Sequence, residues 1–271
     1  MDLVGELTVT RVRALTPRML RVSFGAPEGL THWPDQQIKL CFPRGGSLNL
    51  PASDGDDMRW YQAYTAIPEE SRPWMRSFTV RHHDPDRGEL DVDFVLHGDA
   101  GPAVRWARTA APGQVLGRYG PAASYRTRLR AGDWYLFAGD ETAIPAIGSL
   151  LESLPSPARA LVFLEVADPA EEQPLSTPDA TDVCWLFRSG GASLLDAVRA
   201  LSFPAGAVSA WLAGEAGAVR AMRRHLVDRR GIPKRSIEFA GYWRRKLTQD
   251  DAPTEQDMAE AMERVALAGE D

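Results

Sequence analysis

The hydrophobic pattern divides the chain into two parts, with the change near residue 131. In the first part, short apolar runs alternate with polar positions, and turn signals such as Thr16-Pro17 and Ala26-Pro27 separate them. This pattern predicts strands at 7–12, 19–24, 37–42, 76–82, 90–96 and 115–119. Short strands with little helix between them favour a small closed antiparallel β-barrel.

Two stretches of this first part do not have the strand pattern. Residues 43–73 are rich in Gly, Pro, Ser and Asp, which predicts a long loop or insertion. A short helix is predicted at about 102–108, where Pro102 suits the first helical position. We therefore expect one barrel domain at residues 1–128.

The second part of the chain has a different repeat, in which apolar strands alternate with helices. Strands that are apolar along their whole length and alternate with helices predict a parallel sheet covered on both faces. We expect this α/β domain at residues 129–271. No G-x-G-x-x-G follows its first strand, so the common dinucleotide-binding fingerprint is absent. The predicted strands are 134–138, 160–166, 183–187, 208–212 and 237–240, and the helices are 141–154, 193–200 and 215–230.

The end of the chain predicts one more helix. Thr254 and Asp257 have the spacing of a capping box. The apolar residues Met258, Ala261, Met262 and Val265 then repeat at helical spacing. One interpretation is that this helix packs on the sheet domain, and the other is that it folds back across the mouth of the cleft between the domains.

Composition and charge exclude several classes of protein. A chain of 271 residues with 44% hydrophobic content can form two cores, and its net charge of −6 argues against general nucleic-acid binding. No apolar run reaches 18 residues, and the first residues lack a secretory pattern, so we expect no membrane insertion. Cys41 and Cys184 lie in apolar runs, which predicts buried reduced thiols and a cytoplasmic protein. The histidines form no metal-ligand spacing, so no resident metal is expected.

The segment Arg76-Ser77-Phe78-Thr79-Val80-Arg81 carries the most specific chemistry. A strand here places Phe78 and Val80 on one face, with arginines among the other positions. Phe78 suits a flat heterocycle, Thr79 can hydrogen-bond the edge of that heterocycle, and a guanidinium can hold phosphate oxygens. The alternative is an amphipathic edge strand with solvated arginines.

A second segment, residues 97–107, supplies Gly98 and Gly101, where a ligand can approach the backbone closely. Together the two segments resemble the FAD-binding half of the siderophore-interacting proteins, a branch of the ferredoxin-reductase-like superfamily. The family pattern R-x-Y-T-x-R is matched except that Phe78 replaces tyrosine, which keeps the ring and loses its hydroxyl. H-G-x-A-G-P-A-x-x-W-A is matched from His97 to Ala107.

The later patterns of the family also occur here, and in the same order. These patterns are G-D-E-T-A-[LI]-P-A-I at 139–147, G-E at 214–215 and G-Y-W-R at 241–244. The resemblance implies an antiparallel FAD-binding β-barrel followed by a nicotinamide-binding type of α/β domain. It also implies an FAD-dependent oxidoreductase that reduces ferric siderophores and releases Fe(II). No catalytic acid or base is assigned, because the redox chemistry belongs to the cofactor.

The resemblance implies two groups of site residues and leaves some roles open. Asp140, Glu141 and Thr142 are expected to face the flavin or nicotinamide, although Glu141 or Thr142 can instead cap the helix. The residues expected to contact the cofactors are Arg76, Ser77, Phe78, Thr79, Arg81, His97, Gly98, Ala100, Gly101, Pro102, Ala103, Asp140, Thr142, Ala143, Gly214, Glu215 and Trp243. Lys39, Arg245 and Lys246 are expected to hold the anionic ferric siderophore.

The electron donor and two other functions stay open. Arg220, Arg223 and Arg224 follow Glu215 and either contact a 2′-phosphate, which implies NADPH over NADH, or form a solvated helix face. Reduced ferredoxin is an alternative donor. The other functions are a general NAD(P)H- or ferredoxin-linked flavin reductase and a non-catalytic siderophore-binding protein.

Overall fold

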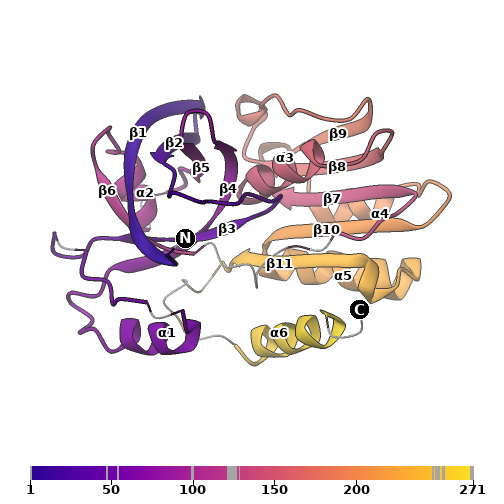
Figure 1. Cartoon of the computed structure of the whole chain (residues 1–271). Helices are drawn as coiled ribbons and strands as arrows, with labels where there is room; N and C mark the ends of the chain where they lie inside the picture. The colour runs from indigo at the N-terminus through magenta and orange to yellow at the C-terminus, as the bar shows by residue number, and fades with distance from the viewer. Residues whose placement is uncertain are drawn as a thin grey trace.

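The structure is a computed structural model that describes residues 2–46, 48–53, 55–98, 101–120, 127, 129–245, 247, 251 and 254–268. Figure 1 shows a barrel built from the first part of the chain beside a layered α/β domain built from the second. The predicted boundary at 128 and 129 lies next to residues outside the described ranges and stays a prediction. None of the described helices is long and apolar enough to cross a membrane.

The first part forms the predicted closed antiparallel barrel, in the order β1-β2-β5-β4-β3-β6. The barrel closes because β1 pairs with both β2 and β6. The side chains of its strands alternate, and the inward-pointing Leu7, Phe24 and Phe94 are buried with Val80 in one apolar core. The strands are β1 (Val4–Thr16), β2 (Met19–Gly25), β3 (Gln37–Phe42), β4 (Trp74–Asp84), β5 (Glu89–Val95) and β6 (Val115–Tyr119).

The segment 43–73 contains a helix that the sequence analysis missed, α1 (Asp57–Thr65). The Asp56 carboxylate accepts a hydrogen bond from the Arg59 N–H and caps the helix. Trp60 packs on Tyr119 of the barrel, with ring centroids 4.0 Å apart. The two buried aromatic residues of this polar segment, Trp60 and Tyr64, are too weak a periodic pattern to predict a helix, so the loop prediction was wrong here. The predicted short helix is α2 (Pro102–Ala107).

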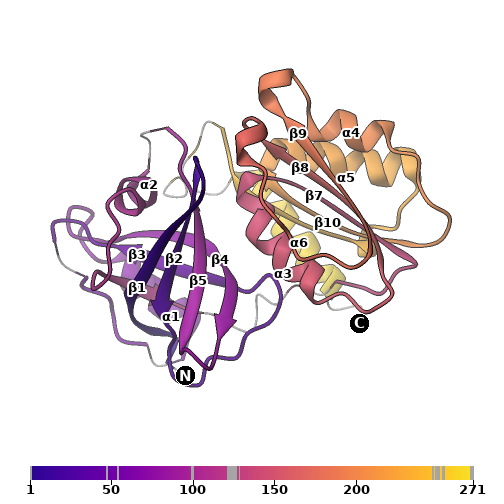
Figure 2. The ribbon, with the colours of Figure 1, turned by 90° about the horizontal axis from the view of Figure 1, so that it is seen from above.

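The second part forms a five-stranded, all-parallel sheet in the order β11-β10-β7-β8-β9. Figure 2 shows α4 and α5 on the face away from the barrel and α3 on the face toward it. This confirms the predicted α/β domain. The strands are β7 (Trp134–Asp140), β8 (Arg159–Val166), β9 (Ala180–Phe187), β10 (Val208–Glu215) and β11 (Ile237–Trp243), and the helices are α3 (Ile144–Glu152), α4 (Leu194–Ala200) and α5 (Ala216–Arg230), with 3₁₀ turns at Glu141–Ala143, Pro169–Glu171, Arg188–Gly190 and Lys234–Ser236.

The edge strand β9 overturns the prediction that both cysteines are buried. Cys41 lies inside the barrel wall and is buried, whereas Cys184 on β9 is exposed, and both are free thiols. Among the described strands, β9 pairs with β8 alone, and its side chains run through exposed and half-buried positions. The apolar run around Cys184 therefore reflects an edge strand with one uncovered face.

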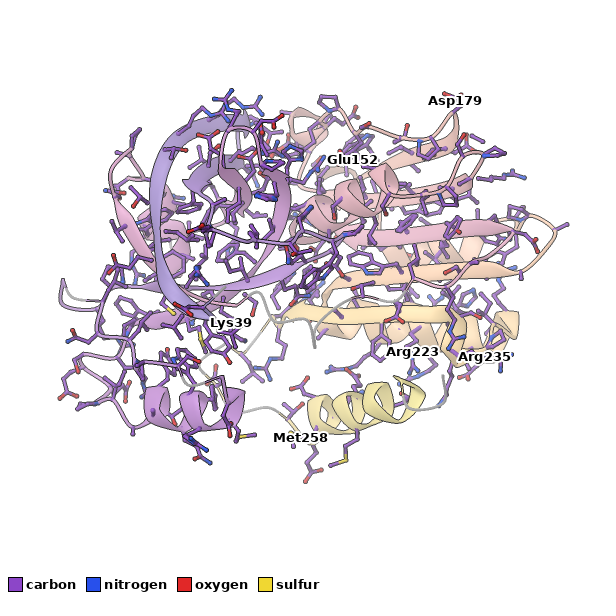
Figure 3. All side chains as sticks on the ribbon, in the orientation of Figure 1. Lys39, Glu152, Asp179, Arg223, Arg235 and Met258 are labelled. Carbon is purple, nitrogen blue, oxygen red and sulfur yellow. The ribbon has the colours of Figure 1, made fainter. Side chains whose placement is uncertain are left out.

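The C-terminal helix, α6 (Glu255–Ala268), begins with the predicted capping box. The Thr254 hydroxyl donates to the Asp257 carboxylate, and the Asp257 N–H donates back to the Thr254 hydroxyl. The apolar stripe does not supply the contact with the sheet, because Met258 and Met262 are 49% and 67% exposed. Figure 3 shows Met258 on the side of α6 away from β11.

Charged side chains hold α6 on the sheet domain, as the first of the two interpretations requires. Arg220 of α5 forms ion pairs with Asp257 and Glu260, at 2.7 and 2.5 Å. Arg223, labelled in Figure 3, pairs with Glu263 at 3.0 Å. The Arg220 and Arg223 side chains are only 21% and 14% exposed, so the solvated-face interpretation fails for both of them.

Candidate functional site

Strand β4 presents two faces with different roles. Phe78 and Val80 turn into the barrel core, and the Phe78 ring lies 4.5 Å from the Phe94 ring and 6.2 Å from the Phe42 ring. Thr79 is buried, and β4 contacts α3 of the α/β domain. The strand that carries the family's flavin pattern is therefore built into the contact between the domains.

Lys39 of β3 lies beside the start of this pattern. It is paired in register with Ser77, and its Nζ lies 3.5 Å from the Ser77 hydroxyl (Figure 3). Burial lowers the pKa of Lys39. Ser77 is exposed, and Arg76 is half-buried with its guanidinium donating to the Met75 carbonyl at 2.9 Å.

Arg81 links β4 to the α/β domain. Its guanidinium donates two hydrogen bonds to the Glu152 carboxylate at the end of α3, at 2.6 and 3.0 Å. A Cβ at Gly148 would lie only 3.0 Å from the Arg81 Nε, so the glycine makes room for this bridge. The role of Arg81 in holding FAD stays a prediction, and Glu152 is its partner in this structure.

The second segment follows β5 and is open to solvent. His97 and Gly98 are exposed, and Gly98 has a φ of 45°, in the left-handed region that favours glycine. The Arg108 guanidinium donates to the Gly98 carbonyl at 2.9 Å. Gly101 and Pro102 start α2, and Ala103 packs on the barrel core. Ala100 lies outside the described residues.

A cavity of about 610 Å³ lies between the domains, next to His97 and Gly98. Its walls are the β1–β2 turn, the end of β5, and the carboxyl ends of β7 and β8. The charged side chains on it are Arg18, Arg108, Glu141, Glu171 and Arg188. Its volume is in the range of small-molecule and cofactor sites, and its position is the usual ligand side of a parallel sheet.

The charges in this cavity largely neutralise one another. Arg188 forms a double hydrogen bond with Glu141, at 2.5 and 2.7 Å, and also reaches Glu165 at 3.3 Å. The hydrogen bonds that Arg188 donates to the Glu141 carboxylate hold the pKa of Arg188 above its ordinary value. Glu171 is buried and accepts from the Thr16 hydroxyl at 2.5 Å. The sequence analysis missed Arg188 and Glu171, although Arg188 directly follows a strand on this rim.

Asp140 joins the ends of three strands. One carboxylate oxygen accepts from the Thr142 N–H and hydroxyl, at 2.9 and 2.5 Å. The other accepts from the Glu215 N–H and from Trp243 Nε1, both at 2.8 Å. Burial raises the pKa of Asp140. The residue that caps the turn before α3 is therefore Asp140, so the alternative in which Glu141 or Thr142 caps it does not hold.

The other predicted residues of this rim mostly serve local structure. Gly214 has a φ of 132°, and a Cβ there would lie 2.5 Å from the Asp140 carboxylate. Glu215 accepts from the Ala218 N–H at 2.9 Å and caps α5. Ala143 is fully buried against Gly139. The contacts of these residues with a cofactor stay predictions.

The predicted substrate residues after β11 are only partly described. Arg245 is exposed, and Lys246 lies outside the described residues. The neighbouring Arg244 pairs with Asp257 of α6 at 2.8 Å. No contact between Arg245 and Lys39 tests whether they form one binding site in the described residues, and the substrate assignments stay predictions.

Asp35 is the most connected residue that the sequence analysis missed. It precedes β3, is 3% exposed, and has a φ of 54°, which is rare for a residue other than glycine. Its carboxylate accepts from Thr127 at 2.5 Å, from Tyr242 at 3.1 Å and from Trp211 Nε1 at 3.3 Å. Burial raises the pKa of Asp35 to about 6. No local pattern predicts this site, because its partners come from distant strands.

Comparison with solved structures shows which fold class the protein has. The ferredoxin reductase of carbazole 1,9a-dioxygenase, in its FAD apo form, has the same fold, with a TM-score of 0.65 over 89% of this chain and 68% of that one. The identity is 17%, so this likeness shows the fold alone. The architecture is thus ferredoxin-reductase-like, as predicted.

Sequence comparison then shows the family. Residues 8–125 match the siderophore-interacting FAD-binding domain, and residues 132–246 match the siderophore-interacting protein family. The chain belongs to the siderophore-interacting protein family, which confirms the prediction from the motifs.

Three relatives illustrate the similarity. The chain is 35% identical to the ferric vibriobactin reductase ViuB of Vibrio cholerae, over 90% of each chain. A siderophore utilization protein from T. fusca is 36% identical with a TM-score of 0.80, over 92% of this chain and 95% of that one. The siderophore-interacting protein SipS of Aeromonas hydrophila is 29% identical with a TM-score of 0.73, over 98% of both.

Proposed function

We propose that this protein is an FAD-dependent ferric-siderophore reductase, which reduces Fe(III) in the chelate and releases Fe(II) for assimilation inside the cell. The observation that carries the proposal is the match to both family domains in order, together with 35% identity to a ferric vibriobactin reductase over 90% of each chain. Proteins of this family differ in their siderophores, and the proposal covers the class of ferric chelates.

The residues present fit FAD. The half-buried Arg76 and the exposed Ser77 precede Phe78, whose ring is only partly covered by the barrel core. The exposed His97 and Gly98 border the interdomain cavity, and arginines lie on its walls. An aromatic ring and cations are the groups that a flat heterocycle with phosphates requires. When bound, FAD takes two electrons from its donor and passes them singly to iron.

The donor is proposed to be NADPH or NADH, with reduced ferredoxin as the alternative. The cavity at the carboxyl ends of β7 and β8 supports a nucleotide donor, because open α/β sheets bind ligands on that edge. The Arg188 guanidinium in this cavity is already paired with Glu141 and Glu165. A phosphate group of the donor would have to displace these carboxylates in order to bind Arg188. Arg220 and Arg223 are held by carboxylates of α6 and would need to leave them to bind a 2′-phosphate.

The substrate is an anionic chelate, and the protein carries a net charge of −6. Capture therefore requires local cations, and we assign it to Lys39, Arg245 and Lys246. Hard catecholate or hydroxamate oxygens hold Fe(III) more tightly than Fe(II), so reduction loosens the complex. We place this chemistry in the cytoplasm, since the free thiols Cys41 and Cys184 suit a reducing compartment.

Two measurements test the proposal. The purified protein is expected to be yellow and to hold non-covalent FAD, and a colourless protein that takes up no added FAD would overturn the assignment. Reduced protein is then mixed with a ferric chelate without oxygen, and ferrozine traps Fe(II). Flavin oxidation without Fe(II) would identify a general flavin reductase, and chelate binding without a flavin change would identify a binding protein.

A further inference from the structure

The carboxyl ends of three neighbouring strands carry one charged cluster, made of Glu141, Glu165 and Arg188. Figure 1 shows these strands, β7, β8 and β9, side by side in the sheet. Glu141 directly follows β7, Glu165 is the last residue but one of β8, and Arg188 directly follows β9. Because parallel strands end at the same edge, the cluster lies on the usual ligand side of the sheet.

Two carboxylates share one guanidinium in this cluster. Arg188 donates to both oxygens of Glu141, at 2.5 and 2.7 Å, and to Glu165 at 3.3 Å. The other Glu165 oxygen accepts from the Leu194 N–H at 3.0 Å, so this carboxylate is held from two sides. Two carboxylates and one guanidinium give the cluster a formal charge of −1 at pH 7. Glu141 and Arg188 line the cavity between the domains.

We propose that this cluster selects NADH over NADPH as the nucleotide donor. This inference rests on the proposed function, because it takes a nicotinamide nucleotide to bind on this rim. The two donors differ in one group, the phosphate on the 2′-oxygen of the adenosine ribose. In open α/β sheets a carboxylate at this ribose accepts from the 2′-hydroxyl of NADH, whereas a guanidinium suits the 2′-phosphate of NADPH.

The pairing within the cluster determines which of these two contacts is available. A ribose hydroxyl can donate to Glu141 and leave the bonds of Arg188 in place. A 2′-phosphate cannot donate in its ionised form, and it brings about −1.5 to −2 charge at pH 7 to a cluster that is already negative. It would bind Arg188 only by displacing two carboxylates, and the displaced carboxylates would then repel it. Repulsion of the wrong ligand is a common source of specificity.

The other cations of the cavity do not reverse this preference. Arg18 of the β1–β2 turn and Arg108 after α2 line the cavity from the barrel side. They suit the pyrophosphate, which NADH and NADPH share, so they do not discriminate between the two. Among the described residues that line the cavity, none belongs to α5, whose Arg220 and Arg223 are paired with carboxylates of α6.

The test compares the two donors on the same protein. The rate of flavin reduction at 0.1 M salt is expected to give a kcat/KM at least about tenfold higher with NADH than with NADPH, since adjacent like charges are costly. Calorimetry with NAD⁺ and NADP⁺ is expected to give the same order of affinity, and it needs no turnover. Equal values for the two donors, or a preference for NADPH, would overturn the inference.

Substitutions then test the residues. Glu141→Gln removes one negative charge and loosens Arg188, so kcat/KM is expected to rise about fivefold with NADPH and to fall about twofold with NADH. Glu165→Gln keeps an acceptor for the Leu194 N–H and is expected to shift the ratio less, about threefold, because its bond to Arg188 is longer. Glu6→Gln, at an exposed position of β1, is the matched control and is expected to leave the ratio unchanged.

Salt gives a second, independent sign. Screening lengths fall from about 10 Å at 0.1 M to about 3 Å at 1 M, so repulsion of the 2′-phosphate weakens and the preference for NADH is expected to shrink about threefold. If arginines bound the 2′-phosphate, salt would instead weaken NADPH relative to NADH. That result, or equal changes for both donors in the Glu141→Gln protein, would show that the cluster serves only the structure of the rim.

The outcomes separate this inference from the proposed function. A protein that holds FAD and releases Fe(II) after chemical reduction, but is reduced by neither nucleotide, would overturn the inference and leave the reductase assignment standing. A protein that takes up no FAD would overturn the reductase assignment. Its relative affinity for NAD⁺ and NADP⁺ would still test the cluster, because both nucleotides can be titrated without a flavin.

Discussion

Two groups of carboxylates in this protein lie in opposite surroundings. Asp35 and Asp140 are buried among neutral donors, and burial raises the pKa of each. Glu263 of α6 lies near the surface between Arg223 and Lys234, and its hydrogen bond to Arg223, with the nearby charges, lowers its pKa. The buried carboxylates hold strand ends and domains together, whereas the surface carboxylates attach one helix. Desolvation therefore has the dominant effect on the pKa of the buried carboxylates, and pairing with cations has the dominant effect on the pKa of Glu263.

The largest effect is expected from Asp140→Ala. This change leaves the N–H groups of Thr142 and Glu215 and the indole N–H of Trp243 without their acceptor. Buried donors without partners are costly, so we expect the free energy of unfolding to fall by about 3 kcal/mol. Urea denaturation measures it. Thr142→Val is the control, which removes only the hydrogen bond from the Thr142 hydroxyl to Asp140 and is expected to lose about 1 kcal/mol. Equal losses in the two variants would contradict the role of Asp140 as the joint of three strands.

The second effect is a pH dependence that comes from Asp35. Its pKa rises from 3.8 to about 6 on folding, so the folded state binds this proton more tightly than the unfolded state. The stabilisation is complete below about pH 4 and is lost as the pH rises through about 6, with a total of about 3 kcal/mol. Among the side chains that hydrogen-bond Asp35 in the described residues, Tyr242 is ionisable, and its raised pKa keeps it neutral in this range.

Asp35→Asn tests this dependence, since the amide does not titrate. We expect the difference in unfolding free energy between parent and variant to change by about 3 kcal/mol between about pH 4 and pH 7, with the parent relatively more stable in acid. Asp140 is present in both proteins, so its own titration cancels in the difference. Parallel curves for the two proteins would show that Asp35 has an ordinary pKa and that burial is not the dominant effect.

The ion pair between Arg81 and Glu152 is intermediate between the two groups. Its side chains are 12% and 34% exposed and join β4 to α3. We expect Arg81→Ala to lower the free energy of unfolding of the FAD-free protein by about 1 kcal/mol. In a double-mutant cycle with Glu152→Ala, the second substitution is expected to cost little more. Full additivity would mean that the pair contributes nothing and that Arg81 is available for FAD phosphate.

The smallest effect is expected from Glu263→Gln on α6. Glu263 is 26% exposed and its partner Lys234 is 55% exposed, so solvent screens these pairs in part. The loss is therefore expected to be about 0.5 kcal/mol and to shrink near 1 M salt. Asp182→Asn, at an exposed position of β9, is the matched control for the change in charge. A loss that persists at high salt would show that the contact of α6 with the domain depends on packing, contrary to the exposure of Met258 and Met262.

The sequence by itself determined the architecture and the family. The hydrophobic pattern changes near residue 131 and separates the barrel from the parallel sheet. Barrel strands bury every second side chain, whereas the strands of a sheet covered on both faces bury nearly all of them. The Thr254 and Asp257 capping box also followed from spacing alone, since both partners lie within one helical turn. The five family patterns needed no structure, because each is a run of neighbouring residues.

Only the tertiary structure decided which side chains are buried and which partners they have. Asp35 and Tyr242 are 207 positions apart, so no local pattern predicts their bond or the raised pKa that follows from burial. Cys184 was expected to be buried from its apolar run, and it is exposed in the fold, as are Met258 and Met262 of the apolar stripe. Periodicity shows that residues share a face, and burial depends on whether another element covers that face.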